Sequence, residues 1–130
     1  MISAVIPKFL FEIEDIITLQ DKGIQLQEGT QVIGNYKVPC YKFMNLSETE
    51  VFDELEKNSL LEADTHRSAE LNGYANRMVS ILFLKLRQIA TMKDKDQKTA
   101  ASCALASAVS SLATVNVGYA KRFLPLLRSI

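Results

Sequence analysis

The stretch SAELNGYANRMVSILFLKLRQIATM, from Ser68 to Met92, decides the fold. It predicts one long helix, because apolar side chains recur at the three- and four-residue spacing of a single helical face. The run Ile81–Leu84 adds apolar residues around most of the circumference, so we expect a helix that is central or contacted on two sides. The predicted core face consists of Leu71, Ala75, Met78, Leu82 and Ile89.

Two more helices are predicted after this one. The segment from Thr99 to Leu112 is helical in its periodicity, with Leu105, Val109 and Leu112 as its larger apolar residues. No charged residue occurs from Thr99 to Ala120, so we expect the small-residue face of this helix to be covered. That face, a candidate protein interface, carries Cys103, Ser107, Ser110 and Thr114. The last helix lies within residues 116–130, and we expect Pro125 to interrupt or restart it.

The first 45 residues mix helical and strand patterns. The segment Pro7–Gln20 predicts a short amphipathic helix. Beyond it, Gly34-Asn35 lies between two strand-like runs and predicts a tight hairpin turn. Pro39 cannot donate to a ladder, so we expect the second strand to be an edge that ends near residues 40–43. The apolar face expected for the first helix carries Phe9, Leu10, Ile13, Ile16 and Ile17.

A capping box marks the start of another helix. Ser47 and Glu50 have the spacing at which each side chain can reach the backbone amide of the other. We therefore expect a helix that begins at Ser47 and fades around Asn58-Ser59.

Composition indicates one folded domain over residues 1–130. Hydrophobic residues make up 48% of the 130 and charged residues 23%, which is typical of a globular protein. The net charge of zero divides unevenly: residues 1–64 hold 5 lysines and 12 carboxylates, a charge of −7, and residues 65–130 hold 10 basic and 3 acidic side chains, a charge of +7. We expect no membrane span, no secretory signal, a cytoplasmic location, and free thiols at Cys40 and Cys103.

The sequence offers little for catalysis. His66 is the single histidine, and no nucleophile motif accompanies it. Glu62, His66 and Glu70 have helical spacing for metal ligands, but an N-cap at Asp64 or Thr65 would exclude Glu62 from the helix. The glycines form no phosphate-binding motif. We expect no enzyme activity, no metal and no cofactor.

Basic residues of the second half are the candidate nucleic-acid contacts. On the long helix they share a polar ridge with Gly73, Ser80 and Thr91. Such a stripe can meet phosphate oxygens without reading sequence. Alternatively, the charges are a solvated face, or they pair with the acidic half inside one molecule. The candidates are Arg77, Arg87, Gln88, Lys93, Lys95, Lys98, Lys121 and Arg122, with Arg128 as a further member.

These patterns predict a mainly α fold: a compact bundle of four to five helices with a small β-hairpin inserted in the N-terminal half. For function, we first expect a non-catalytic small subunit of a nucleoprotein assembly, whose acidic and basic halves dock copies head to tail. In size and charge layout alone, the chain is similar to the small helical subunits of CRISPR effector complexes. The alternative is a protein-only adaptor or scaffold that binds partners through the uncharged Ser/Ala helix face.

Overall fold

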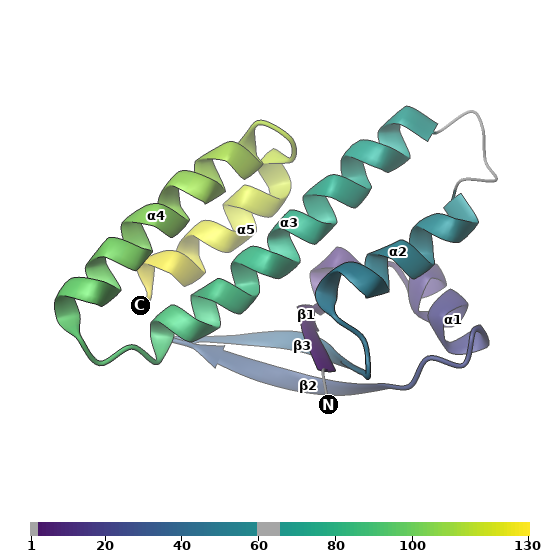
Figure 1. Ribbon diagram of the computed structural model, residues 1–130, viewed down its shortest axis with the longest axis horizontal. Helices are drawn as coiled ribbons and strands as arrows, with labels where there is room; N and C mark the ends of the chain where they lie inside the picture. Colours follow the sequence, from purple (N-terminus) through teal and green to yellow (C-terminus); the bar gives the residue numbers. More distant parts are fainter. Residues whose placement is uncertain (1–2, 60–65) are drawn as a thin grey trace.

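Helix α3 (His66–Ala90) is the element on which much of the molecule packs (Figure 1). The structure, a computed structural model, describes residues 3–59 and 66–130, and residues 58–59 and 66–73 by their backbone alone. Helix α3 contacts α2 (Glu48–Ser59), α4 (Lys95–Ala113) and strand β1 (Ser3–Pro7), so the expectation of a helix contacted on two sides is confirmed. It begins and ends two residues earlier than the predicted span. Among its described side chains, the buried ones are Ala75, Val79, Ser80, Leu82, Phe83, Leu86 and Ile89.

The expected small hairpin is part of a three-stranded antiparallel sheet. Strands β2 (Leu26–Ile33) and β3 (Tyr36–Met44) form the hairpin, and β1 adds to the free side of β3, in the order β1-β3-β2. The expectation that β3 is an edge strand is therefore wrong. Met44 donates its N–H to Gln25, so strand alternation directs the nitrogen of Pro39 towards β1. Strand β1 ends at Pro7, opposite Cys40, so no residue of β1 lies opposite Pro39. The N–H that Pro39 lacks therefore removes no hydrogen bond between β1 and β3.

The predicted helix over Pro7–Gln20 is correct only in its second half. The chain forms β1, then a 3-10 turn (η1, Lys8–Leu10), then α1 (Ile13–Asp21). Helix α1 begins where the Glu12 N–H donates to Asp15 Oδ2 at 2.9 Å. Just before it, Phe11 stacks on Phe52 of α2 with ring centroids 5.4 Å apart. This aromatic contact packs the segment before α1 against α2.

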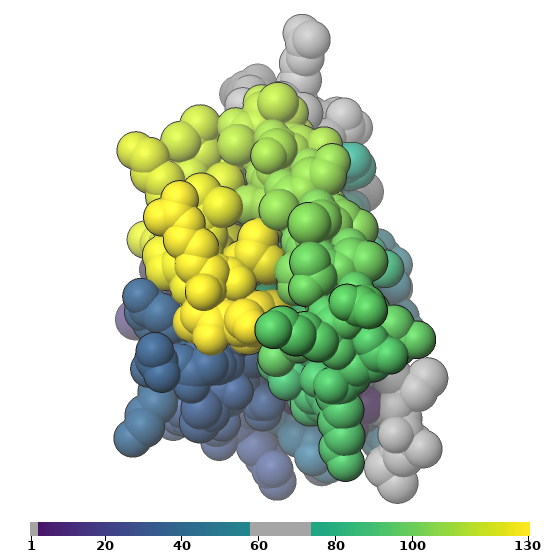
Figure 2. Space-filling view, turned by 90° about the vertical axis from the view of Figure 1, so that its left-hand side faces the viewer, coloured from purple at the N-terminus to yellow at the C-terminus, as the bar shows by residue number. Residues whose placement is uncertain are grey.

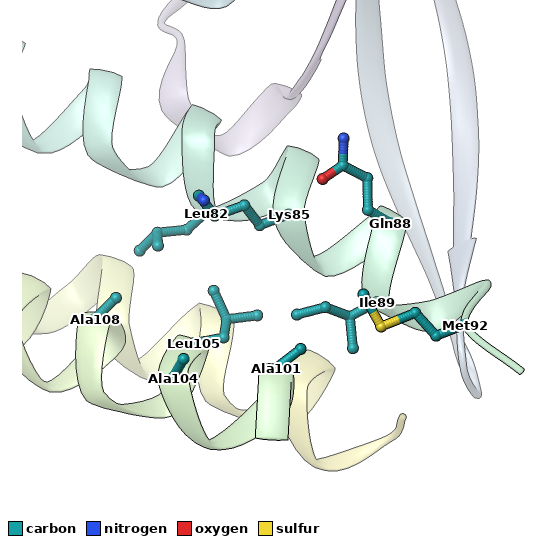
Figure 3. A pocket seen from close by; sticks show the side chains of 9 residues that line it. All are labelled: Leu82, Lys85, Gln88, Ile89, Met92, Ala101, Ala104, Leu105 and Ala108. Carbon is teal, nitrogen blue, oxygen red and sulfur yellow. The ribbon is translucent and has the colours of Figure 1, made fainter. Parts of the chain in front are cut away.

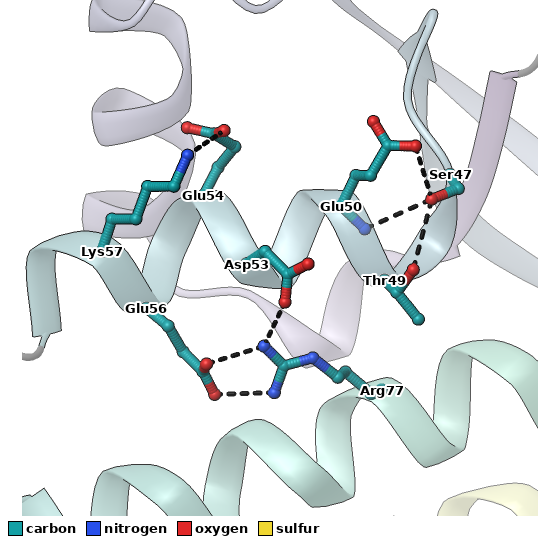
Figure 4. Close-up of polar contacts among 8 residues, drawn as sticks. All are labelled: Ser47, Thr49, Glu50, Asp53, Glu54, Glu56, Lys57 and Arg77. Carbon is teal, nitrogen blue, oxygen red and sulfur yellow. Dashed lines mark hydrogen bonds and ion pairs between the residues drawn. The ribbon is translucent and has the colours of Figure 1, made fainter.

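The capping box of α2 is present in a modified form (Figure 4). Ser47 Oγ accepts from the Glu50 N–H at 3.3 Å, as predicted, and donates to the Glu50 carboxylate at 2.9 Å. Val51 and Phe52 of α2 are buried. The helix ends at Ser59, as expected from the sequence.

Helices α4 and α5 (Val117–Arg128) form an antiparallel pair beside α3. Asp94 caps α4, so this helix begins before the predicted Thr99. Pro125 does not interrupt α5, which continues past it to Arg128. Ser129 Oγ donates to the Ile33 carbonyl at 3.1 Å, and Figure 2 shows α5 between α4 and the hairpin. Among the described residues, no helix is long and apolar enough to span a bilayer.

Candidate docking groove and the basic residues

A groove lies between α3 and α4, with a volume of about 320 Å³ (Figure 3). The wall formed by α4 is shallow, because it is built largely of alanines: Ala101, Ala104, Ala108 and the larger Leu105. The opposite wall consists of Leu82, Lys85, Gln88 and Ile89 of α3, with Met92 just after the end of the helix. Lys85 is the only charged side chain among these lining residues. We call this feature the α3–α4 groove.

Apolar side chains continue along the exposed side of α3 beyond the groove. Tyr74 is 55% exposed and Ile81 is 39% exposed. Both line a second hollow of about 300 Å³, which also includes Met78 and shares Leu82 with the α3–α4 groove. Tyr74 and Ile81 therefore extend the apolar surface beyond the groove along the described part of α3. Extended apolar surface of this kind is typical of interaction sites.

Arg77, predicted on an exposed polar ridge, is held by two carboxylates of α2 (Figure 4). Its Nη1 and Nη2 each lie 2.7 Å from an oxygen of Glu56, and Nη2 lies 2.6 Å from Asp53 Oδ1. The hydrogen bonds that Arg77 donates to Glu56 and Asp53 raise the pKa of Arg77 above its ordinary value, although desolvation opposes them. At this residue the basic half pairs with the acidic half of the same molecule.

The other residues of the predicted ridge do not form one surface. Ser80 is fully buried and donates to the Asn76 carbonyl at 2.9 Å, so its placement on the ridge is wrong. Arg87 is half-buried and acts electrostatically on Cys40 of β3. Gln88 is exposed and lines the α3–α4 groove. Arg77, Arg87 and Gln88 therefore have three different surroundings.

Some of the remaining candidates do come together. Lys95 and Lys98 of α4 line a hollow of about 560 Å³ with Arg128 of α5, and Lys93 is exposed in the loop before α4. Lys121 and Arg122 are exposed on α5. The Arg122 guanidinium lies over the Phe9 ring, 5.3 Å from its centroid. The basic candidates thus cluster in part, around the start of α4 and the end of α5.

The small-residue face of α4 is exposed within the chain. Cys103, Ser107, Ser110 and Thr114 are all exposed, so the described part of the chain does not cover this face. The Ser110 hydroxyl donates to the Ala106 carbonyl, and the Thr114 hydroxyl donates to the Ser111 carbonyl. The hydroxyl groups of these two residues therefore bind backbone carbonyls of the preceding helical turn. The prediction that this face is a protein interface stays a prediction.

The groups considered for chemistry contribute no assembled site to the described structure. Glu62 lies outside the described residues, and only the backbone is described at His66 and Glu70. Within the described part of the chain, no three His, Cys, Asp or Glu residues are grouped to hold a metal ion. Burial raises the pKa of Cys40 to about 11, against opposing effects from a hydrogen bond with Gln31 and the charge of Arg87.

Sequence reasoning missed the α3–α4 groove itself. The spacing of Ala101, Ala104 and Ala108 signals close approach along one helix edge, but it does not identify the element that α4 faces. No protein-family model, no curated protein and no solved structure matches the chain.

Proposed function

We propose that the chain is a non-catalytic adaptor or scaffold subunit that binds a partner protein in the α3–α4 groove. The observation that supports this most is the open, largely apolar groove, continued along α3 by Tyr74 and Ile81. Apolar surface left in water is unfavourable by about 25 cal/mol per Å², so its burial by a partner favours binding. A protein-binding adaptor has more support than a nucleic-acid-binding subunit. The reason is that Arg77, a candidate phosphate contact, instead binds Asp53 and Glu56 of the same chain.

The shape of the groove favours a helical occupant. Its α4 wall is built of alanines, which allow a partner backbone to come close, while the longer side chains of α3 supply contacts opposite. Lys85 at the rim can pair with a carboxylate on the partner. Ala104 is exposed on α4, so the surface continues from the groove onto the small-residue face.

The proposal is tested by placing a photo-cross-linking amino acid at Ala104 in cells, with the same substitution at Gln27 on β2 as the control. Both positions are exposed, but Gln27 is remote from the groove. We expect a polypeptide adduct at position 104, identified by mass spectrometry, and none at position 27. Equal adducts at both positions, or no polypeptide adduct at position 104, would contradict the proposal.

A second candidate function is sequence-independent contact with a nucleic-acid backbone. It is favoured by the hollow that brings Lys95, Lys98 and Arg128 together. Phosphate contacts release counterions, so affinity for single strands should fall with a log–log salt slope of about −0.7 per phosphate contacted. The joint replacement Lys95→Glu with Lys98→Glu should weaken binding to all sequences alike, and Arg77→Met should leave it unchanged. Anisotropy titrations at two salt concentrations that detect no binding at low salt would reject this function.

A further inference from the structure

We infer that the α3–α4 groove receives helix α1 of a second copy of this chain, so that copies associate head to tail. This inference rests on the proposed function, because it names the partner of the same groove. Two complementary surfaces on one chain support it, and they lie on different elements.

The first surface is the exposed side of α1. Ile13 is 76% exposed and Ile17 is 51% exposed, one helical turn apart. The sequence pattern predicts both in a core face, and the structure shows that this is wrong: Leu19 is the side chain of α1 that is fully buried. Glu14 and Asp21 are exposed on the same helix, and neither forms an ion pair within the described structure. The α1 surface is therefore apolar and acidic.

The second surface is the α3–α4 groove, which is apolar and basic. Lys85 is exposed at its rim and has no ion-pair partner among the described side chains. No acidic side chain lines the groove. An incoming α1 would bury Ile13 and Ile17 against the alanine wall, while Glu14 or Asp21 comes near Lys85. The net charges of the two halves of the sequence are also opposite: α1 lies in the half of charge −7, and the groove lies in the half of charge +7.

The positions of the two surfaces require a second molecule. In Figure 1, α1 lies at the end of the molecule away from α4, so a chain cannot place its own α1 in its own groove. A symmetric pairing of α1 with α1 would bring Glu14 and Asp21 against the same acidic groups, and like charges across an interface are unfavourable. The favoured contact joins unlike surfaces, so an associated pair of copies keeps one free groove and one free α1.

Sedimentation velocity on the purified full chain, over a range of concentrations, tests this contact. The α1 variant combines Ile13→Gln with Ile17→Gln, which removes apolar surface without changing the charge. The groove variant is Ala104→Glu. Its matched control is Ser110→Glu, which adds the same charge to an exposed position of α4 that does not line the groove. Circular dichroism verifies that all variants remain folded.

We expect the parent chain to associate as its concentration rises, and the α1 and groove variants each to raise the dissociation constant at least tenfold. Ser110→Glu should associate as the parent does. An equimolar mixture of the α1 and groove variants should form a 1:1 dimer, because one supplies an intact groove and the other an intact α1.

Several results would overturn the inference. A parent chain that stays monomeric at every concentration would do so, as would a groove variant that still associates by itself or a mixture without the dimer. An effect of Ser110→Glu equal to that of Ala104→Glu would move the contact to the small-residue face. If the parent chain is monomeric and position 104 still cross-links to a different polypeptide in cells, this inference fails and the proposed function remains. If position 104 yields no polypeptide adduct, the proposed function fails as well.

Discussion

Replacing Arg77 with methionine should destabilise the fold by about 2 kcal/mol. Hydrogen bonds to charged groups contribute about 1.5–3 kcal/mol when buried, and fully exposed ion pairs about 0.2–1 kcal/mol. The Arg77 side chain is 22% exposed, Glu56 is 32% exposed and Asp53 is 57% exposed, so the site lies between these limits. We assign about 1.5 kcal/mol to the paired contacts with Glu56 and about 0.5 kcal/mol to Asp53. Methionine keeps much of the aliphatic stem and removes the guanidinium.

Urea denaturation followed by circular dichroism measures this effect. With a denaturant dependence of roughly 2 kcal/mol per M, the midpoint should fall by about 1 M. Arg128→Met is the control for the loss of one positive charge, because Arg128 is exposed and has no ion pair with a described residue. Arg77→Lys should recover less than half of the loss, since an ammonium cannot reproduce the two-nitrogen contact with Glu56.

A double-mutant cycle separates the ion pair from other effects at Arg77. Combined with Glu56→Gln, Arg77→Met should reveal a coupling free energy of about 1 kcal/mol. A midpoint shift below about 0.3 M, or one equal to that of Arg128→Met, would refute the reasoning. Arg77 would then be available for a ligand instead of being required between α2 and α3.

Two further predictions concern the thiols and the hairpin turn. Iodoacetamide at pH 8 should modify exposed Cys103 and leave Cys40 unmodified until the protein unfolds, because Cys40 is buried and its pKa of about 11 leaves about a thousandth of it as thiolate; equal labelling rates in the folded protein would contradict this. Gly34→Ala should lower Tm by at least about 4 °C, because Gly34 has a φ of +57° and an added Cβ would meet Ser129. Gly29→Ala is the control, since a Cβ there meets nothing within 4 Å and its φ is not positive, and a similar loss at both sites would argue against the strain.

Local signals in the sequence were sufficient for most of the helices and for the hairpin. The Ser47–Glu50 capping box predicts the start of α2, and Gly34 predicts the turn between β2 and β3. The periodicity around Phe83 predicts a long central helix. These features depend on residues within one turn or one hairpin of each other, so the sequence displays them directly. That is also why the mainly α fold class could be predicted.

Tertiary structure decided which strands pair and which faces are covered. Strand β1 has apolar residues on both sides, including Val5 and Ile6, and such a run has no period that separates a strand from a helix. Its pairing with β3 makes Pro39 part of a central strand, which no local rule indicates.

The candidate surfaces depended on tertiary structure even more strongly. Periodicity identifies Ile13 as part of an apolar face, but whether that face is covered depends on the path of the rest of the chain. The sequence left open whether Arg77 faces solvent or the acidic half, and the packing of α2 on α3 brings Glu56 to it from 21 residues away. A side chain is covered or paired by groups distant along the chain, and local sequence does not encode where those groups lie.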